Sequence, residues 1–185
     1  MPTDLTIFAA KYLVFIDLVL AAILVLMLLY QRSRPAWLTW GVAAVIMAVL
    51  SFVFAKIGAA AYNDPRPFTS CAHPSFCRLI AHAADNGFPS DHALLAAAIV
   101  AAILFLAPRY SLPFVILAIL IDWARVGSGI HHVADVVGSS LFVAVAAIIA
   151  WLVAPVITTW ITPFVPKSLL GEESTEASIA GQRTT

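Results

Sequence analysis

Long uncharged runs of apolar residues dominate the pattern along this chain. Residues 36–55 form twenty positions without a single charge, which at ~1.5 Å per residue cover the ~30 Å hydrocarbon core of a bilayer. Residues 12–30 form a similar run that only Asp17 interrupts, and residues 136–154 form a third, whose helix Pro155 is expected to end or kink. These runs predict three membrane-spanning helices.

Two further apolar runs are too short to cross a bilayer unless polar neighbours join them. Residues 93–107 need the segment 89–92, and residues 111–121 need the segment 122–125. Both segments carry charged side chains, which at membrane depth usually face the bundle interior or a water-filled pocket. We therefore expect an all-α integral membrane protein of about five spanning helices, with a polar pocket where helices two to five reach one surface.

The overall composition agrees with a lipid environment. The chain is 62% hydrophobic and 11% charged, and its mean hydropathy is +0.98, whereas soluble domains are ~25% charged. Ten basic residues balance ten acidic ones, so no basic excess indicates a nucleic-acid partner. We expect one transmembrane domain over residues 1–169 and a polar, disordered tail over residues 170–185.

The connections between the runs indicate an orientation. With five spans, the loops 31–35 and 108–110 share one side with the C-terminal tail, and these segments carry Arg32, Arg34, Arg109 and Lys167. By the positive-inside tendency this side is cytoplasmic. The loops on the other side hold three arginines of their own, so the charge difference is small. The polar pocket is then expected on the extracytoplasmic side.

Polar residues gather in three clusters, and the last of them offers the clearest chemistry. His131 and Asp135 are four residues apart, which places them on one face if a helix begins just before them. The carboxylate would fix the tautomer of the imidazole and leave its other nitrogen free to attack or to bind a metal. Arg125 adds a permanent planar charge suited to phosphate.

The two earlier clusters add an anion site and further cations. Pro89 and Ser90 stand at the start of a predicted helix, where serine can cap and free N–H groups attract an anion. His92 follows, placed to give or take a proton. Arg66 lies between two prolines, and Lys56 ends an apolar run from which it can snorkel to the same mouth.

This set of side chains suits phosphoryl transfer. Cations and N–H groups can stabilise the charge that spreads over the equatorial oxygens of the transition state. One histidine can attack phosphorus while the other protonates the leaving oxygen. The sequence shows no carboxylate-rich metal cage, which argues against two-metal hydrolysis. We expect neither a metal nor a cofactor.

The clusters resemble the three signatures of the type-2 phosphatidic acid phosphatase superfamily of membrane lipid phosphatases. These signatures are a lysine with a downstream Arg-Pro, then Pro-Ser-Gly-His, then Ser-Arg with a histidine and an aspartate at set spacing. In this chain they read Lys56…Arg66-Pro67, Pro89-Ser90-Asp91-His92, and Ala124-Arg125…His131…Asp135. The spacer after Lys56 is longer than usual, Asp91 replaces a glycine, and Ala124 replaces a serine.

One branch of that superfamily is the most similar. The Pro-Ser-Asp-His form, together with segments 62–68 and 82–88, resembles the bacitracin-resistance type of undecaprenyl-diphosphatase in the bacterial cytoplasmic membrane. This resemblance implies release of the terminal phosphate from a polyprenyl diphosphate on the outer face of that membrane, which recycles the cell-wall lipid carrier.

The resemblance also implies roles for individual residues. His131 would be the nucleophile that forms a phosphohistidine, Asp135 would orient it, and His92 would protonate the leaving phosphate. The phosphate-binding residues would be Arg66, Arg125, Ser90 and Lys56, with Asp91 beside them. Asp91 either tunes His92 or favours the helix N-terminus by its charge.

Several alternatives stay open at this point. The lipid could be phosphatidylglycerophosphate or phosphatidate, or the chain could be a non-enzymatic, histidine-rich membrane protein that binds metal or transports; no tight His/Cys ligand pair supports the latter. Cys71 and Cys77 could bridge in an oxidising exterior. His132 is expected to be structural, and His73 and His82 are expected in loops. The oligomeric state is not predicted.

Overall fold

The computed structural model describes residues 4–28, 31, 33–73 and 77–166. It contains the helices α1 (Asp4–Leu28), α2 (Arg34–Ala61), α4 (Asp91–Leu106), α5 (Ser111–Gly127) and α6 (Val133–Ile161), and the short turns η1 (Pro67–Ser70), η2 (Pro108–Tyr110) and η3 (Thr162–Phe164). No strand occurs within these ranges, so the prediction of an all-α membrane protein is confirmed. The predicted tail at 170–185, Arg32 and Lys167 lie outside the described residues.

The helices differ from the predicted spans mainly at their ends. Four of them are long and apolar enough to cross a bilayer, and α4, with 16 residues, is about 24 Å long. α4 recruits Asp91 and His92 but begins after Ser90, whose side chain makes no capping hydrogen bond. α6 continues through Pro155 to Ile161, so the expectation that this proline could end the helix is wrong.

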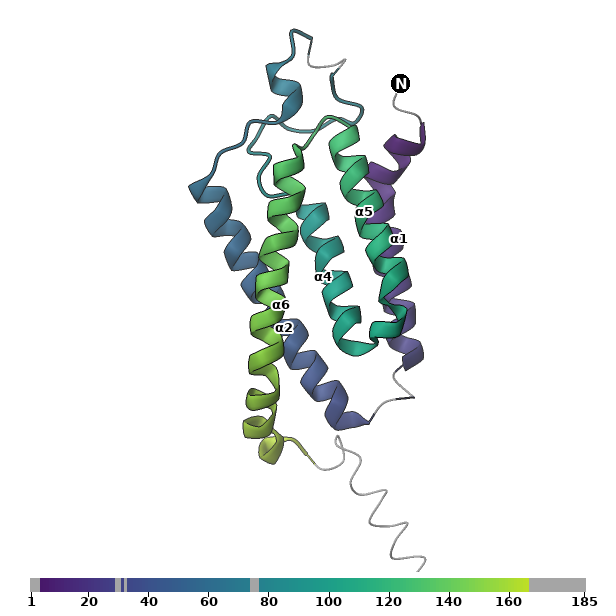
Figure 1. Ribbon diagram of the computed structural model, residues 1–185, viewed down its shortest axis with the longest axis vertical. Helices are drawn as coiled ribbons and strands as arrows, with labels where there is room; N and C mark the ends of the chain where they lie inside the picture. The colour runs from purple at the N-terminus through teal and green to yellow at the C-terminus, as the bar shows by residue number, and fades with distance from the viewer. Residues whose placement is uncertain (1–3, 29–30, 32, 74–76, 167–185) are drawn as a thin grey trace, which may run out of the picture.

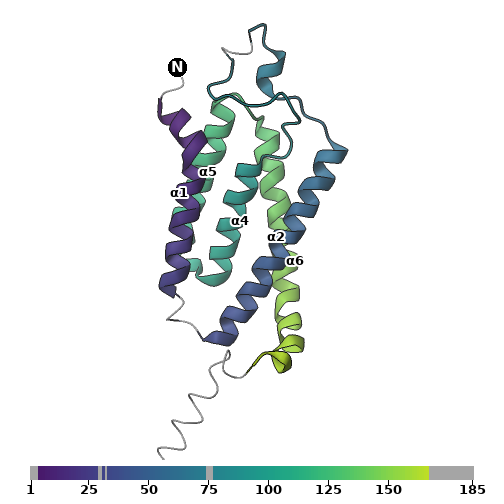
Figure 2. The same cartoon turned by 180° about the vertical axis from the view of Figure 1, so that it is seen from behind.

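Successive helices run in alternate directions, and this brings the polar clusters to one end of the bundle. The loop between α2 and α4 and the connection from α5 to α6 lie together at the upper end in Figure 1, while the α4–α5 turn lies at the lower end. α6 packs on α2 and α4, and α5 packs on α4 and α1. Figure 2 shows the same order from behind.

Small residues line the contacts between helices, and large apolar residues face outward. Ala96 on α4 and Ala146 and Ala150 on α6 are completely buried, whereas Trp151 and Trp160 on the same helix are mostly exposed. Small side chains allow the helix backbones to approach closely, and lipid covers the large ones. This distribution is typical of a multi-pass membrane protein.

The long loop is anchored on the end of the bundle by an apolar patch, and a disulfide closes part of the loop on itself. Phe68 and Ile80 pack against a cluster that includes Ala10 of α1 and Ala124 of α5. Cys71 and Cys77 form a disulfide, with their Cα atoms 6.4 Å apart. The loop that carries Arg66 is therefore fixed to the bundle by this patch, and the disulfide restricts its tip.

The disulfide gives a direct chemical prediction. The denatured but unreduced protein is expected to show no reactive thiol, and reduction is expected to release both of the chain's two cysteines. A Cys71→Ser variant provides the control, because it should show one thiol without reduction. Two reactive thiols in the untreated wild-type protein would reject the bridge.

Candidate active site

His131 lies at the centre of a buried cluster between α5 and α6. Its Nε2 is 3.3 Å from Arg66 Nη1 and 3.3 Å from Arg125 Nη2, and its Nδ1 is 3.2 Å from Asp135 Oδ2. A guanidinium group has no acceptor, so Nε2 must be the unprotonated nitrogen and Nδ1–H must donate to Asp135. The ring therefore presents a lone pair to two positive charges.

The local backbone explains how His131 and Asp135 meet. α6 begins two residues after His131, and Asp135 in its first turn accepts the N–H of His132 at 2.8 Å, as in one half of a capping box. Gly129, with φ of 74°, makes the turn before it, and a Cβ there would collide with the carbonyl of Cys77. The pair therefore forms across a helix start, and not along one helix as expected.

Arg66 is buried and held by groups that the sequence analysis did not assign. Its Nε donates to Asp85 Oδ1 at 2.7 Å, Nη1 donates to the carbonyl of Ile130 at 3.0 Å, and Nη2 donates to the carbonyl of Asn86 at 3.4 Å. The hydrogen bond from Arg66 lowers the pKa of Asp85 below its ordinary value. For Asp85 and Asn86, the sequence signal is the segment 82–88 that contains them.

The side chain of Asn86 joins this loop to the end of α2. It accepts hydrogen bonds from the N–H groups of Asp64 (2.9 Å) and Phe88 (3.1 Å). It donates to the carbonyls of Ala59 (3.1 Å) and Tyr62 (3.0 Å). All of its hydrogen-bonding groups are used within the protein, so Asn86 shapes the site without being free to bind a ligand.

Two other predicted phosphate-binding residues are buried beside the cluster. Arg125 donates from Nη1 to the carbonyl of Ala10 at 3.1 Å, and its Nε has no partner. Ser90 is fully buried; its N–H donates to Ser139 Oγ at 2.9 Å, and its own hydroxyl has no partner. Buried polar groups are normally paired, so both side chains retain hydrogen-bonding capacity. Arg125 lines the cavity beside the cluster and could use it on a bound anion, whereas Ser90 does not line that cavity.

A cavity of about 560 Å³ opens beside the cluster. Its permanent cations are Arg66, Arg125 and Lys56, and the carboxylates of Asp85 and Asp91 also line it. The Lys56 ammonium lies 5.2 Å from the ring centroid of Phe52, one turn along α2. Residues of all three polar clusters thus line one cavity, and Lys56 lies on the side that α2 forms.

Three histidines line the same cavity. His92 on α4 faces it, with the ring of Phe15 6.5 Å away, and the ring of His82 lies 6.4 Å from that of His131. The prediction placed His82 in a loop, and its contact with the site went unrecognised. Burial lowers the pKa of His82, and the positive charge of Arg66 acts in the same direction.

The environment of His131 favours its neutral form. Burial lowers the pKa of His131, the hydrogen bond to Asp135 opposes this effect, and the charges of Arg125 and Arg66 reinforce it. A neutral imidazole with a lone pair on Nε2 is a nucleophile. The site therefore combines a neutral imidazole with two adjacent guanidinium groups, a kind of group that suits phosphate oxygens.

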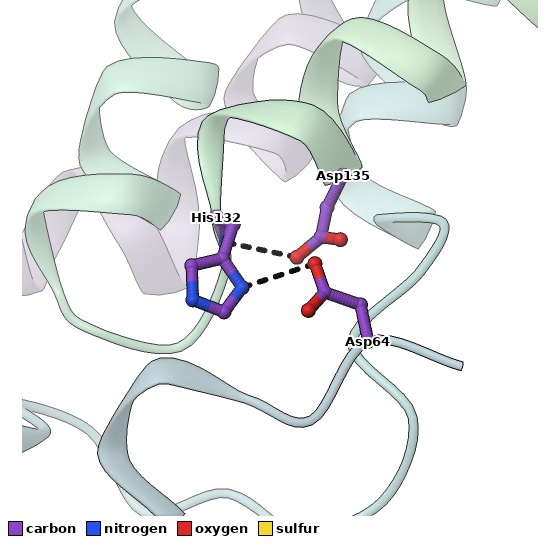
Figure 3. A group of neighbouring side chains, drawn as sticks. All are labelled: Asp64, His132 and Asp135. Atoms are coloured by element: carbon purple, nitrogen blue, oxygen red, sulfur yellow. Dashed lines mark hydrogen bonds and ion pairs between the residues drawn. The ribbon is translucent and has the colours of Figure 1, made fainter. Parts of the chain in front are cut away.

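Asp64, His132 and Asp135 form a second polar cluster behind His131, shown in Figure 3, with possible ligand atoms within 4.8 Å of one another. Asp64 Oδ2 lies 3.0 Å from His132 Nδ1. Asp135 Oδ2 already receives two hydrogen bonds. A metal would have to displace these contacts, so the geometry is that of a hydrogen-bonded cluster.

An apolar helical bundle that ends in a cavity lined by imidazole and guanidinium groups defines a membrane protein whose polar site suits an anion. The chain belongs to the PAP2 superfamily, whose model matches residues 9–160.

Individual relatives point in the same direction. The chain is similar to "Undecaprenyl-diphosphatase BcrC" of Bacillus subtilis (strain 168), with 37% identity over 65% of the chain and 58% of the relative. It is 32% identical to "Bacitracin transport permease protein BcrC" of Bacillus licheniformis, over 60% of the chain and 56% of that relative. It is 30% identical to a "Lipid A 1-phosphatase" of Rhizobium etli, over 60% of the chain and 50% of that relative. The chain thus spans between half and three fifths of these relatives, and no solved structure matches it.

Proposed function

We propose that this protein is a membrane phosphatase that hydrolyses undecaprenyl diphosphate to undecaprenyl phosphate and phosphate. The observation that carries the proposal is the convergence of Arg66 and Arg125 on the Nε2 lone pair of His131, whose other nitrogen donates to Asp135. The family and the name of the Bacillus subtilis relative support the same reaction class and substrate.

In the first half of the reaction, His131 Nε2 attacks the terminal phosphorus. The bond from phosphorus to the bridging oxygen breaks, its electron pair leaves with undecaprenyl phosphate, and His92 supplies a proton to that oxygen. The N–H groups of Arg66 and Arg125, which now face Nε2, then donate hydrogen bonds to the equatorial oxygens of the phosphoryl group. Asp135 keeps the proton on Nδ1 and stabilises the positive charge that develops on the ring.

In the second half, water attacks the phosphohistidine. His92, left neutral by the first step, accepts the proton of that water, and the bond from phosphorus to Nε2 breaks to release phosphate and free His131. The groups that would contact the phosphoryl group, His131, His92, Arg66 and Arg125, line one cavity, and Asp135 acts on it through His131. This cycle requires neither a metal nor another cofactor.

The shape of the cavity suits a lipid with a charged head. From the imidazoles it continues along an apolar wall made by Phe52 of α2 and by Leu95 and Ala98 of α4, two helices that pack against each other less than either packs on α6. The diphosphate would lie at the polar end, with the polyprenyl chain along the wall and out into the bilayer.

The proposed orientation places the cavity on the extracytoplasmic side of the bacterial cytoplasmic membrane. Arg109, in η2, lies at the opposite end of the bundle from the cavity, which agrees with the positive-inside tendency. The disulfide in the loop beside the cavity also suits an oxidising compartment. Release of phosphate on this side would return the carrier lipid for another cycle.

Purified protein in detergent is expected to release phosphate from undecaprenyl diphosphate in the presence of EDTA, because the site supplies its own nucleophile and cations. Vanadate should inhibit competitively, since it mimics the transferring phosphoryl group. Colorimetric phosphate release measures both effects. Absence of release, or release only after a divalent metal is added, would contradict the proposal.

A lipid panel separates this substrate from its nearest competitor. The similarity to a lipid A 1-phosphatase makes another lipid phosphate the second candidate, so the same assay should include phosphatidate, phosphatidylglycerophosphate and lipid A. The proposal requires the highest kcat/KM for the polyprenyl diphosphate. A clear preference for a glycerophospholipid or for lipid A would assign the second function.

A further inference from the structure

Asp64 and His132 join the two loops that carry the central groups of the site. Asp64 is held by its main chain, because its N–H donates to Asn86 Oδ1 at 2.9 Å and its carbonyl accepts the N–H of Gly87 at 2.8 Å. Its carboxylate reaches 3.0 Å from His132 Nδ1. Arg66 follows two residues after Asp64, and His131 directly precedes His132, so this contact links the positions of both.

His132, which contacts Asp64, is also hydrogen-bonded to Asp135. The N–H of His132 donates to Asp135 Oδ2, the oxygen that also receives Nδ1–H of His131. A shift of His132 would therefore move the carboxylate that orients the nucleophile. The fit is tight, because a Cβ at Gly87 would lie 3.1 Å from Asp135 Oδ2 and 3.1 Å from the carbonyl of Asp64. Figure 3 shows the two carboxylates facing each other on one side of His132.

The carboxylate of Asp64 lies close to Asp135, behind His131. The groups that face the imidazole are Asp135 of α6, Arg125 of α5, Arg66 and His82 of the long loop, and His92 of α4. The two arginines oppose a positive charge on the ring, and the carboxylates favour it. Asp64 is thus a second carboxylate on the Asp135 side of the ring, in contact with His132.

We propose that Asp64 and His132 form a second histidine–carboxylate pair, one that positions Asp135 and sets the pH at which His131 becomes nucleophilic. Both are positioning residues, since neither lines the cavity. The inference deepens the proposed function and rests on it, because its kinetic tests need turnover.

The charge of Asp64 is tested by Asp64→Asn. The amide oxygen of asparagine can still accept from His132 Nδ1, so the variant keeps the contact and removes the negative charge. His131 must be neutral to attack, and loss of a nearby negative charge favours the neutral form. The acidic limb of the kcat/KM profile should therefore move to lower pH by about 0.5–1 unit. Asp4→Asn, the same change at an exposed position of α1, should leave the limb in place.

The positioning role is tested by a pair of variants at His132. His132→Ala removes the contact with Asp64 and should lower kcat by about 10-fold, with KM changed by less than about 2-fold. His132→Asn should restore kcat to within about 3-fold of wild type. Its amide nitrogen can replace Nδ1 as donor, and asparagine is also favoured before a helix. Equal loss in both variants would overturn the positioning role.

Three outcomes separate this inference from the proposed function. If the wild-type protein releases phosphate and Asp64→Asn does not move the acidic limb, the inference is wrong and the function stands. If the wild-type protein is inactive, NMR titration of His131 in detergent still tests the effect of Asp64, and an unchanged midpoint in Asp64→Asn rejects it. If EDTA abolishes activity, zinc restores it, and His132→Ala removes that response, the cluster is a metal site and the inference fails.

Discussion

His131→Ala is expected to abolish phosphate release, with a loss of about 10³-fold or more in kcat, because the variant has no nitrogen to form the covalent intermediate. The change also leaves Arg66 and Arg125 facing an empty space, since both now lie 3.3 Å from His131 Nε2. Some loss of stability is therefore expected. Thermal unfolding in detergent must be measured beside activity.

His131→Gln is the matched control for that loss of stability. The amide oxygen of glutamine can accept from the guanidinium groups, but it cannot become phosphorylated in the manner of an imidazole. This variant should fold nearly as well as wild type and be as inactive as His131→Ala. Brief incubation with substrate labelled in its terminal phosphate, followed by an alkaline quench, should leave acid-labile label on the wild-type protein alone. Substantial turnover by either variant would remove His131 from its role.

Arg66→Ala has the second largest expected effect, a fall of about 10²–10³-fold in kcat/KM, or ~3–4 kcal/mol of transition-state stabilisation. Arg66→Lys should recover little of it. The planar guanidinium contacts Asp85, the carbonyl of Ile130 and His131 at the same time, and a single ammonium cannot reproduce this fork.

The control for Arg66 is an arginine at the opposite end of the bundle. Arg109 lies over the ring of Tyr110, 4.7 Å from its centroid, and Arg109→Lys should leave kcat/KM within about 2-fold of wild type. Steady-state kinetics with undecaprenyl diphosphate measures both variants. Near-normal activity in Arg66→Lys would show that only charge is needed at this position.

The helical architecture was predictable because a bilayer imposes a simple rule. A segment that enters hydrocarbon must pair all of its backbone groups internally, so long apolar runs become helices. The two short runs were also informative, since polar residues were needed to extend them. The expectation that Pro155 could end the helix was wrong because α6 continues beyond it to Ile161, and local sequence contains no record of the packing that supports that last part of the helix.

The site was predictable in its residue types and less so in its supporting contacts. The spacing of Arg125, His131 and Asp135 indicated a nucleophile with its partners. The partners of Arg66 were not assigned, and His132 was expected to be merely structural. Asp85 is 19 positions from Arg66, and Asp64 is 68 positions from His132. No periodicity connects residues so far apart in two loops.

By itself, the amino-acid sequence determined that this is an integral membrane protein. It also determined that the chain carries an imidazole, a carboxylate and guanidinium groups at a spacing suited to phosphate. Composition and local spacing suffice for that, because burial in lipid and neighbours on a chain are local properties. Only the tertiary structure decided which nitrogen of His131 is free, what encloses Arg66, and how Asp64 and His132 stand behind Asp135. These features depend on the mutual placement of helix ends, which arises when the long helices of the bundle pack together.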